Sequence, residues 1–197
     1  MAALRQSSVH RIALVLLFAA AASTEGFAQE RAILLEFAPA QTSIEFTLED
    51  PLHTVHGAFN LKHGQVRYDP ATGVVSGEIV VDTTSGHSGS NARDSRMHRE
   101  ILESAKYPET VFRPDRADAK LKAQGTSTVQ VHGIFNIHGT DHEITIPVQV
   151  EMAKNRWTAS AHFEIPYVKW GIKNPSNFFL HVSQTVTIDI RASGPNP

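Results

Sequence analysis

The sequence predicts an all-β chain that folds as an antiparallel barrel or sandwich of about eight to ten strands. Apolar and polar residues alternate with a period of two along most of the chain, which is typical of strands with one buried and one exposed face. Turn-forming residues interrupt the alternation at short intervals, and such short connections favour hairpins between antiparallel strands. A single segment shows the periodicity of a helix.

Four segments show the alternation most clearly, because apolar residues recur in them at alternate positions. Turn signals, rich in glycine, proline, asparagine and aspartate, separate the expected strands. The alternating segments are 44–48, 143–152, 157–165 and 182–190, and turn signals lie at 69–73, 124–125, 139–141 and 154–155.

The segment 90–105 (SNARDSRMHREILESA) breaks the alternation, because its apolar residues recur at a spacing of four. This spacing predicts one amphipathic helix over about residues 91–105. Asn91 and Asp94 resemble a capping box at the start of that helix. We expect the helix to close one end of a barrel.

Residues 1–28 are interpreted as a secretory signal peptide. Arg5 and Arg11 precede the apolar run 12–22, and Gly26-Phe27-Ala28 offers small residues at the −3 and −1 positions of a cleavage site. The apolar run is too short for a transmembrane helix, and no other run approaches the required length of about 18 residues. The mature chain is therefore expected to be secreted and to lack an integral membrane segment.

The length and composition of the chain after residue 28 limit the number of domains and exclude several classes of binding site. Residues 29–192 are expected to form one domain with a single core, followed by a flexible tail at 193–197. The full sequence has a net charge of −2, which gives no reason to expect nucleic acid as a partner. Cysteine is absent, which removes thiolate metal sites, iron–sulfur clusters and cysteine nucleophiles.

A short sequence occurs twice, as VHGAFNLKHG at 55–64 and as VHGIFNIHG at 131–139. Treated as strands, both copies place valine, glycine and phenylalanine on the inner face and direct His56, His132 and His138 outward. Gly57 and Gly133 precede the phenylalanines by two residues, where a missing side chain lets a strand bend or a neighbour approach. The repeat therefore predicts one kind of bent barrel strand used twice.

Histidine-based metal binding is the alternative interpretation of the repeat. His53 and His56 are three residues apart, so a regular strand directs them to opposite faces. His138 and His142 are separated by an expected turn. Zinc requires three or four convergent ligands, and no window of the sequence supplies them. We therefore assign no metal site and expect no cofactor.

The segment Gly86-His87-Ser88-Gly89-Ser90 resembles the setting of a hydrolase nucleophile elbow, because it follows a strand-like run and precedes the helix. It lacks the second glycine of G-x-S-x-G, and the chain does not alternate strands with helices. A hydrolase that uses Ser88 stays a minor alternative, as does a catalytic role for Arg93-Asp94. No catalytic residue is assigned.

Several motifs, taken together and in order, resemble those of the YceI-like family. The resemblance covers about residues 38–192. The motifs are the turn Asp69-Pro70, the block Arg93-Asp94 with Tyr107-Pro108 and Phe112, the strand Gly133–Gly139 (GIFNIHG), the element Trp170-Gly171-Ile172 and the closing strand Val182–Ile190.

The resemblance implies an extended, lipocalin-like antiparallel β-barrel of about eight strands, found in secreted bacterial proteins. It also implies a central apolar cavity that holds a long isoprenoid or related lipid, such as a polyprenyl chain or a quinone tail. We therefore predict a non-enzymatic periplasmic protein that binds, sequesters or transports such a lipid, either as a single chain or as a homodimer. The inward residues expected to line the cavity are Phe46, Phe59, Met97, Ile101, Phe112, Phe135, Phe163, Trp170 and Phe179.

Composition alone does not separate a hollow barrel from a filled one, because side chains can fill a small barrel completely. The second hypothesis is therefore a solidly packed stress-response or interaction protein that uses surface histidines to bind metal or a partner. The hydrolase at Ser88 is the third hypothesis.

Overall fold

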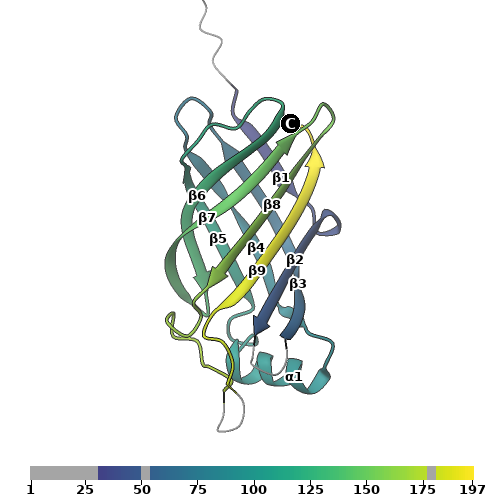
Figure 1. Cartoon of the computed structure of the whole chain (residues 1–197), viewed down its shortest axis with the longest axis vertical. Helices are drawn as coiled ribbons and strands as arrows, with labels where there is room; N and C mark the ends of the chain where they lie inside the picture. Colours follow the sequence, from purple (N-terminus) through teal and green to yellow (C-terminus); the bar gives the residue numbers. More distant parts are fainter. Residues whose placement is uncertain (1–30, 50–53, 177–180) are drawn as a thin grey trace, which may run out of the picture.

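The alternating segments form strands that close into one antiparallel barrel with a short helix at one end (Figure 1). The computed structural model describes residues 31–49, 54–176 and 181–197. The signal peptide expected at 1–28 lies outside the described residues. Within the described ranges, every helix is too short or too polar to cross a membrane.

Strands that follow one another in sequence pair from β2 to β9, and β9 pairs back onto β2, which closes the barrel. The nine strands of the described chain are β1 (Ile33–Phe37), β2 (Thr42–Glu49), β3 (Thr54–Tyr68), β4 (Val75–His87), β5 (Glu109–Ala117), β6 (Gly125–Ile137), β7 (Thr140–Met152), β8 (Arg156–Ile165) and β9 (Val186–Pro195).

β1 and β2 together occupy one position in the barrel. β1 pairs with residues 64–68 of β3, and β2 pairs with residues 54–59 of the same strand. The 3-10 turn η1 (Pro39–Gln41) interrupts the line between them. The barrel therefore has eight strand positions, which confirms the predicted fold class.

The repeated sequence makes the same contact in two strands. A Cβ added to Gly57 would lie 2.3 Å from Phe46 Cζ, and one added to Gly133 would lie 2.9 Å from Phe112 Cε2. Each glycine thus leaves room for a phenylalanine of the neighbouring strand, whose ring meets the phenylalanine of the repeat. The ring pairs are Phe46–Phe59, with centroids 5.4 Å apart, and Phe112–Phe135, with centroids 6.4 Å apart.

The barrel interior is filled at the end away from the helix. Trp157 is fully buried there, and its ring centroid lies 5.1 Å from that of Phe37. Close packing of this kind leaves no room for a guest molecule at this end. The buried apolar residues of the packed end are Leu35, Val66, Tyr68, Val75, Val150, Met152, Trp157 and Ala192.

The helix is shorter than the predicted span of 91–105. α1 (Asn91–Arg96) continues into one π-helical turn, η2 (Met97–Ile101). The chain leaves the helix because Glu103 adopts a left-handed conformation with φ of 44°, and the Ser104 backbone N–H donates to the His98 carbonyl at 3.0 Å.

The predicted capping box does not form. Ser90 is the N-cap residue, and it makes no side-chain hydrogen bond to the helix. Asp94 instead accepts a hydrogen bond from the Ser88 backbone N–H at 2.9 Å, so its carboxylate stabilises the preceding loop rather than the first turn.

Two further boundaries differ from the sequence prediction. The turn between β6 and β7 is His138-Gly139 rather than 139–141, with φ of 53° and 73°, as expected for a two-residue type I′ hairpin. β9 spans Val186–Pro195 rather than 182–190, and therefore enters the segment predicted as a tail. Its pairing with β8 continues to Pro195, and Gly194 leaves the space that the Trp157 ring occupies.

Candidate functional site

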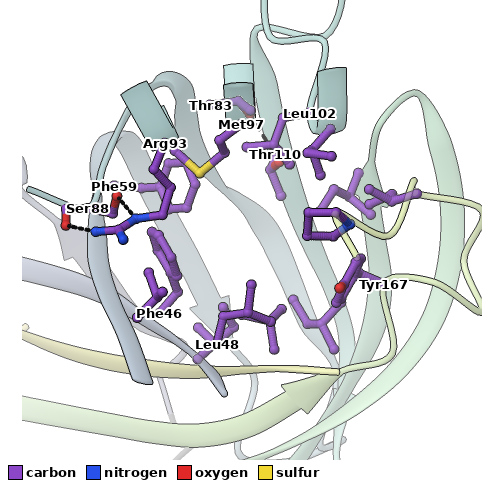
Figure 2. Close-up of a pocket in the computed structure, with 18 of the residues that line it drawn as sticks. Phe46, Leu48, Phe59, Thr83, Ser88, Arg93, Met97, Leu102, Thr110 and Tyr167 are labelled. Carbon is purple, nitrogen blue, oxygen red and sulfur yellow. Dashed lines mark hydrogen bonds between the residues drawn. The ribbon is translucent and has the colours of Figure 1, made fainter. Parts of the chain in front are cut away.

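The barrel end beneath the helix encloses a cavity of about 550 Å³ (Figure 2). Ligand pockets in proteins commonly measure about 300–1,000 Å³, so this volume suits a small molecule or part of a longer one. The lining residues are Ile44, Phe46, Leu48, Val55, Phe59, Val81, Thr83, Ser88, Arg93, Arg96, Met97, Ile101, Leu102, Thr110, Ile137, Ile165, Tyr167, Ile172, Pro175, Val182, Val186 and Ile188.

Period-two alternation turns one face of each strand into the cavity. Ile44, Phe46 and Leu48 are alternate residues of β2, and Val186 and Ile188 are alternate residues of the adjacent β9. Their partners across the barrel come from the helix, and Figure 2 shows Met97 and Leu102 opposite Leu48. The inner faces of the strands therefore form the wall of the apolar cavity, and the helix covers one end of it.

Four of the nine residues predicted from the sequence line this cavity: Phe46, Phe59, Met97 and Ile101. Phe112, Phe135, Phe163 and Trp170 are not among the lining residues, and they belong to an apolar cluster that shares Ile101 and Tyr167 with the cavity wall. Phe179 lies outside the described residues. Ligand contact by all nine residues stays a prediction.

Sequence reasoning missed the polar residues of the cavity wall. Thr83 and Thr110 are polar residues on an inward face, where alternation predicts apolar ones. Their hydroxyls lie 3.1 Å apart and satisfy each other, so β4 and β5 tolerate them in the wall. The sequence could not identify these two threonines as inward residues, because each is tolerated there only through its hydrogen bond to the other, and that contact depends on the pairing of β4 with β5.

Tyr167 comes from the irregular segment that follows β8, and it was also missed. Its hydroxyl donates a hydrogen bond to the Ser183 carbonyl at 2.6 Å. Burial raises the pKa of Tyr167, so the phenol stays neutral near neutral pH. Tyr167 therefore adds a polar group to the wall without adding a charge.

Hydrogen bonds attach the helix to the loops on both sides of the cavity mouth. Arg93 donates from Nε to Ser88 Oγ at 2.7 Å and from Nη2 to Ser88 O at 2.8 Å (Figure 2). The Ser88 hydroxyl in turn donates to Asp94 Oδ1. On the other side, Arg96 Nη2 donates to Pro175 O at 3.2 Å. These hydrogen bonds hold the helix over the cavity.

The geometry does not support a serine hydrolase. Within the described part of the chain, the Ser88 hydroxyl bonds Asp94 and Arg93 and has no histidine partner. The nearest histidine in sequence, His87, places Nδ1 3.4 Å from Ser85 O. The Ser88 hydroxyl is instead part of a loop network with the Asp94 carboxylate and the Arg93 guanidinium, and this differs from the serine–histidine pair of such enzymes.

Outward histidines form pairs with single carboxylates. His132 Nδ1 lies 2.8 Å from Asp115 Oδ1, and His162 Nδ1 lies 2.8 Å from Asp189 Oδ1. Among the described residues, no group of three or more histidine, aspartate or glutamate side chains could hold a metal ion.

These features define a class of protein: a closed antiparallel barrel with an apolar cavity at one end that is large enough for a ligand. A sequence model of the YceI-like domain matches residues 35–193, and the chain belongs to this family. The resemblance seen in the sequence motifs is thereby confirmed. No curated protein sequence matches the chain.

Solved structures share the fold at low sequence identity. BcnA from Burkholderia cenocepacia is 17% identical with a TM-score of 0.67, and the match covers 80% of this chain and 99% of that one. A polyisoprenoid-binding domain from Saccharophagus degradans, implicated in plant cell wall breakdown, is 18% identical with a TM-score of 0.65, covering 84% and 98%. The YCEI protein of Campylobacter jejuni is 16% identical with a TM-score of 0.59, covering 73% and 85%.

Proposed function

We propose that the protein binds the apolar chain of an isoprenoid or similar lipid in the cavity beneath the helix, and sequesters or carries it without catalysing a reaction. The observation that carries this proposal is the apolar cavity of about 550 Å³ at the barrel end beneath the helix. Membership of the YceI-like family supports it, as does the fold shared with a polyisoprenoid-binding domain.

The energetics of the cavity favour a ligand of this kind. Each methylene group transferred from water into an apolar site contributes about 0.8 kcal/mol. A prenyl or acyl chain can therefore bind tightly with few polar contacts, and the paired hydroxyls of Thr83 and Thr110 leave little demand for them. A protein of this kind would shield the chain while it crosses an aqueous compartment.

The proposed compartment is the periplasm. The predicted signal peptide at residues 1–28 supports export, and the chain without cysteine needs no disulfide for its fold. Sequestration and transport are both compatible with this location.

A cavity-filling substitution tests the proposal. Leu48→Trp places a large ring in the cavity, whereas Thr47→Trp places the same ring on the outer face of β2. Protein purified without detergent is mixed with a polyprenyl alcohol and examined by native mass spectrometry. We expect one lipid per chain for the wild type and Thr47→Trp, and strongly reduced uptake for Leu48→Trp.

Circular dichroism must show that both variants keep the β-sheet signal of the wild type. A wild-type protein that takes up no polyprenyl lipid would contradict the proposal. Equal uptake by Leu48→Trp would place the lipid elsewhere on the molecule.

A further inference from the structure

We infer that the cavity mouth selects lipids with an anionic head group of the phosphate type, and that Arg93, assisted by Arg96, recognises this group. The inference rests on the proposed function, because it assigns the head of a lipid whose tail fills the cavity. Three observations lead to it: Arg93 has no ion-pair partner among the described residues, its side chain is held in place by hydrogen bonds, and the described cavity lining contains two arginines and no carboxylate.

Arg93 is a cation whose bonding partners are neutral. Both of its hydrogen bonds go to Ser88, one to the hydroxyl and one to the backbone carbonyl. Within the described ranges, no carboxylate forms an ion pair with Arg93, and its Nη1 group makes no hydrogen bond. A guanidinium that lines an apolar cavity without a counter-ion is suited to receive an anion from a ligand.

The side chain of Arg93 is held in position before any ligand arrives. Asp94 accepts hydrogen bonds from both the backbone N–H and the hydroxyl of Ser88, and this leaves the lone pairs of the hydroxyl oxygen for Arg93 Nε. A charged group that is already oriented loses less conformational entropy on binding. The Asp94 carboxylate therefore orients Arg93 through Ser88.

Arg96 adds a second guanidinium to the same cavity wall. Its Nε lies 3.4 Å from Glu100 Oε2, in a pair whose side chains are about 40% exposed. Exposed pairs of this kind are weak, and Glu100 also faces Lys173 at 3.7 Å. One carboxylate is thus shared between two cations.

The charges at the mouth favour an anion. Among the described residues that line the cavity, Arg93 and Arg96 are charged, and none is a carboxylate. Arg93 is exposed to water at the rim, while the cavity below it is apolar. An amphiphile with its tail inside would place its head group at this rim.

A matched pair of lipids tests the inference. The probes are a polyprenyl alcohol and the polyprenyl monophosphate with the same tail, titrated separately into the full chain. The measured quantity is the ratio of the two dissociation constants. We expect the wild type to bind the phosphate about tenfold more tightly, as one charge-assisted hydrogen-bonded contact would provide.

Substitutions of Arg93 and Arg96 then test whether these residues cause the preference for the phosphate. Arg93→Gln is expected to reduce the ratio about tenfold, to near one, and Arg96→Gln to reduce it by a smaller factor. Arg99→Gln, an exposed arginine of the same helix outside the cavity lining, is the matched control and should leave the ratio unchanged. Arg93→Lys should restore part of the preference.

The outcomes separate this inference from the proposed function. Tight binding of both lipids with a ratio near one in the wild type would overturn the inference and leave the proposed function intact. If Arg93→Gln weakens the binding of both lipids equally and preserves the ratio, Arg93 only holds the helix in place. That result would also overturn the inference. Failure of the wild type to bind either lipid would overturn both.

Discussion

At the scale of single residues, Asp69 stabilises the turn between β3 and β4 through its carboxylate. Oδ1 of Asp69 accepts a hydrogen bond from the Ala71 backbone N–H at 2.9 Å, and the Asp69 carbonyl accepts one from Gly73 at 2.8 Å. The Ala71 bond, followed by the Thr72 hydroxyl, lowers the pKa of Asp69 from its ordinary value. The folded state therefore prefers the ionised carboxylate more strongly than the unfolded chain does.

This preference predicts a pH-dependent effect of Asp69→Asn, which keeps the acceptor oxygen but removes the charge. A lowered pKa gives stabilisation that is present above the ordinary value of 3.8 and is lost as the pH falls through the folded-state value. The stability difference between wild type and variant should be present at pH 7 and vanish in acid. Thermal unfolding across that range checks it, and a difference independent of pH would contradict it.

Single residues also show which part of the site the sequence could predict. Alternation indicates the inner face of a strand, and Phe46 and Phe59 were assigned to the cavity on that basis. It does not tell how deep a residue lies along the barrel or what stands opposite. Phe135 and Phe163 share the inner face but are buried in the neighbouring apolar cluster, where the Trp170 ring lies with its centroid 5.8 Å from that of Phe135.

At the scale of elements, the helix is attached to the barrel mouth by a few polar contacts. Asp94 bonds Ser88 in the loop before the helix, and His98 Nε2 lies 2.8 Å from the Gly86 carbonyl. The described helix spans only residues 91–101, and none of its residues is fully buried. Its local stability therefore depends strongly on these contacts.

Hydrogen exchange can measure that dependence. Asp94→Ala removes the contact with Ser88 and should speed amide exchange in residues 91–101, with little change in β6 and β7. Asn91→Ala is the matched control, because Asn91 is exposed and forms no cap in the structure. Faster exchange in Asn91→Ala than in Asp94→Ala would favour the capping box that the sequence suggested.

The strands were predictable as elements because their alternation is long and regular, as in β7 and β8. The end of the helix was not, since the apolar spacing continues to Ala105 while the chain turns at Glu103. That turn is contacted from outside the segment, where the His138 ring also packs on Tyr107 with centroids 4.3 Å apart. His138 Nε2, in the β6–β7 hairpin, lies 2.8 Å from Glu103 Oε2, and local periodicity carries no information about such a contact.

At the scale of the whole molecule, the barrel is packed at one end and hollow at the other. Leu35 and Leu48 allow the two ends to be compared with one chemical change, because both lie in the interrupted first position of the barrel. Leu35 is 5% exposed and belongs to the packed cluster around Trp157, whereas Leu48 lines the cavity. The Leu35 side chain is therefore packed against protein on all sides, whereas part of the Leu48 side chain faces the cavity.

We expect Leu35→Ala to cost more stability than Leu48→Ala in lipid-free protein. Leucine-to-alanine changes in packed cores cost about 2–5 kcal/mol, and the cost grows with the lost contacts and the new void. Leu35→Ala should fall within that range and Leu48→Ala at or below about 2 kcal/mol. Urea denaturation of both variants measures the difference, and equal losses would show that the cavity end is as tightly packed as the other.

The closure of the barrel has a consequence for its biosynthesis. Residues 42–47 of β2 pair with residues 187–192 of β9, so an early strand and the last strand of the described chain are neighbours in the barrel. β2 is synthesised early and β9 is synthesised last. Until β9 is available, the sheet has two unpaired edge strands that can pair with other chains. The nascent protein therefore needs protection from aggregation until nearly its whole length has been translated.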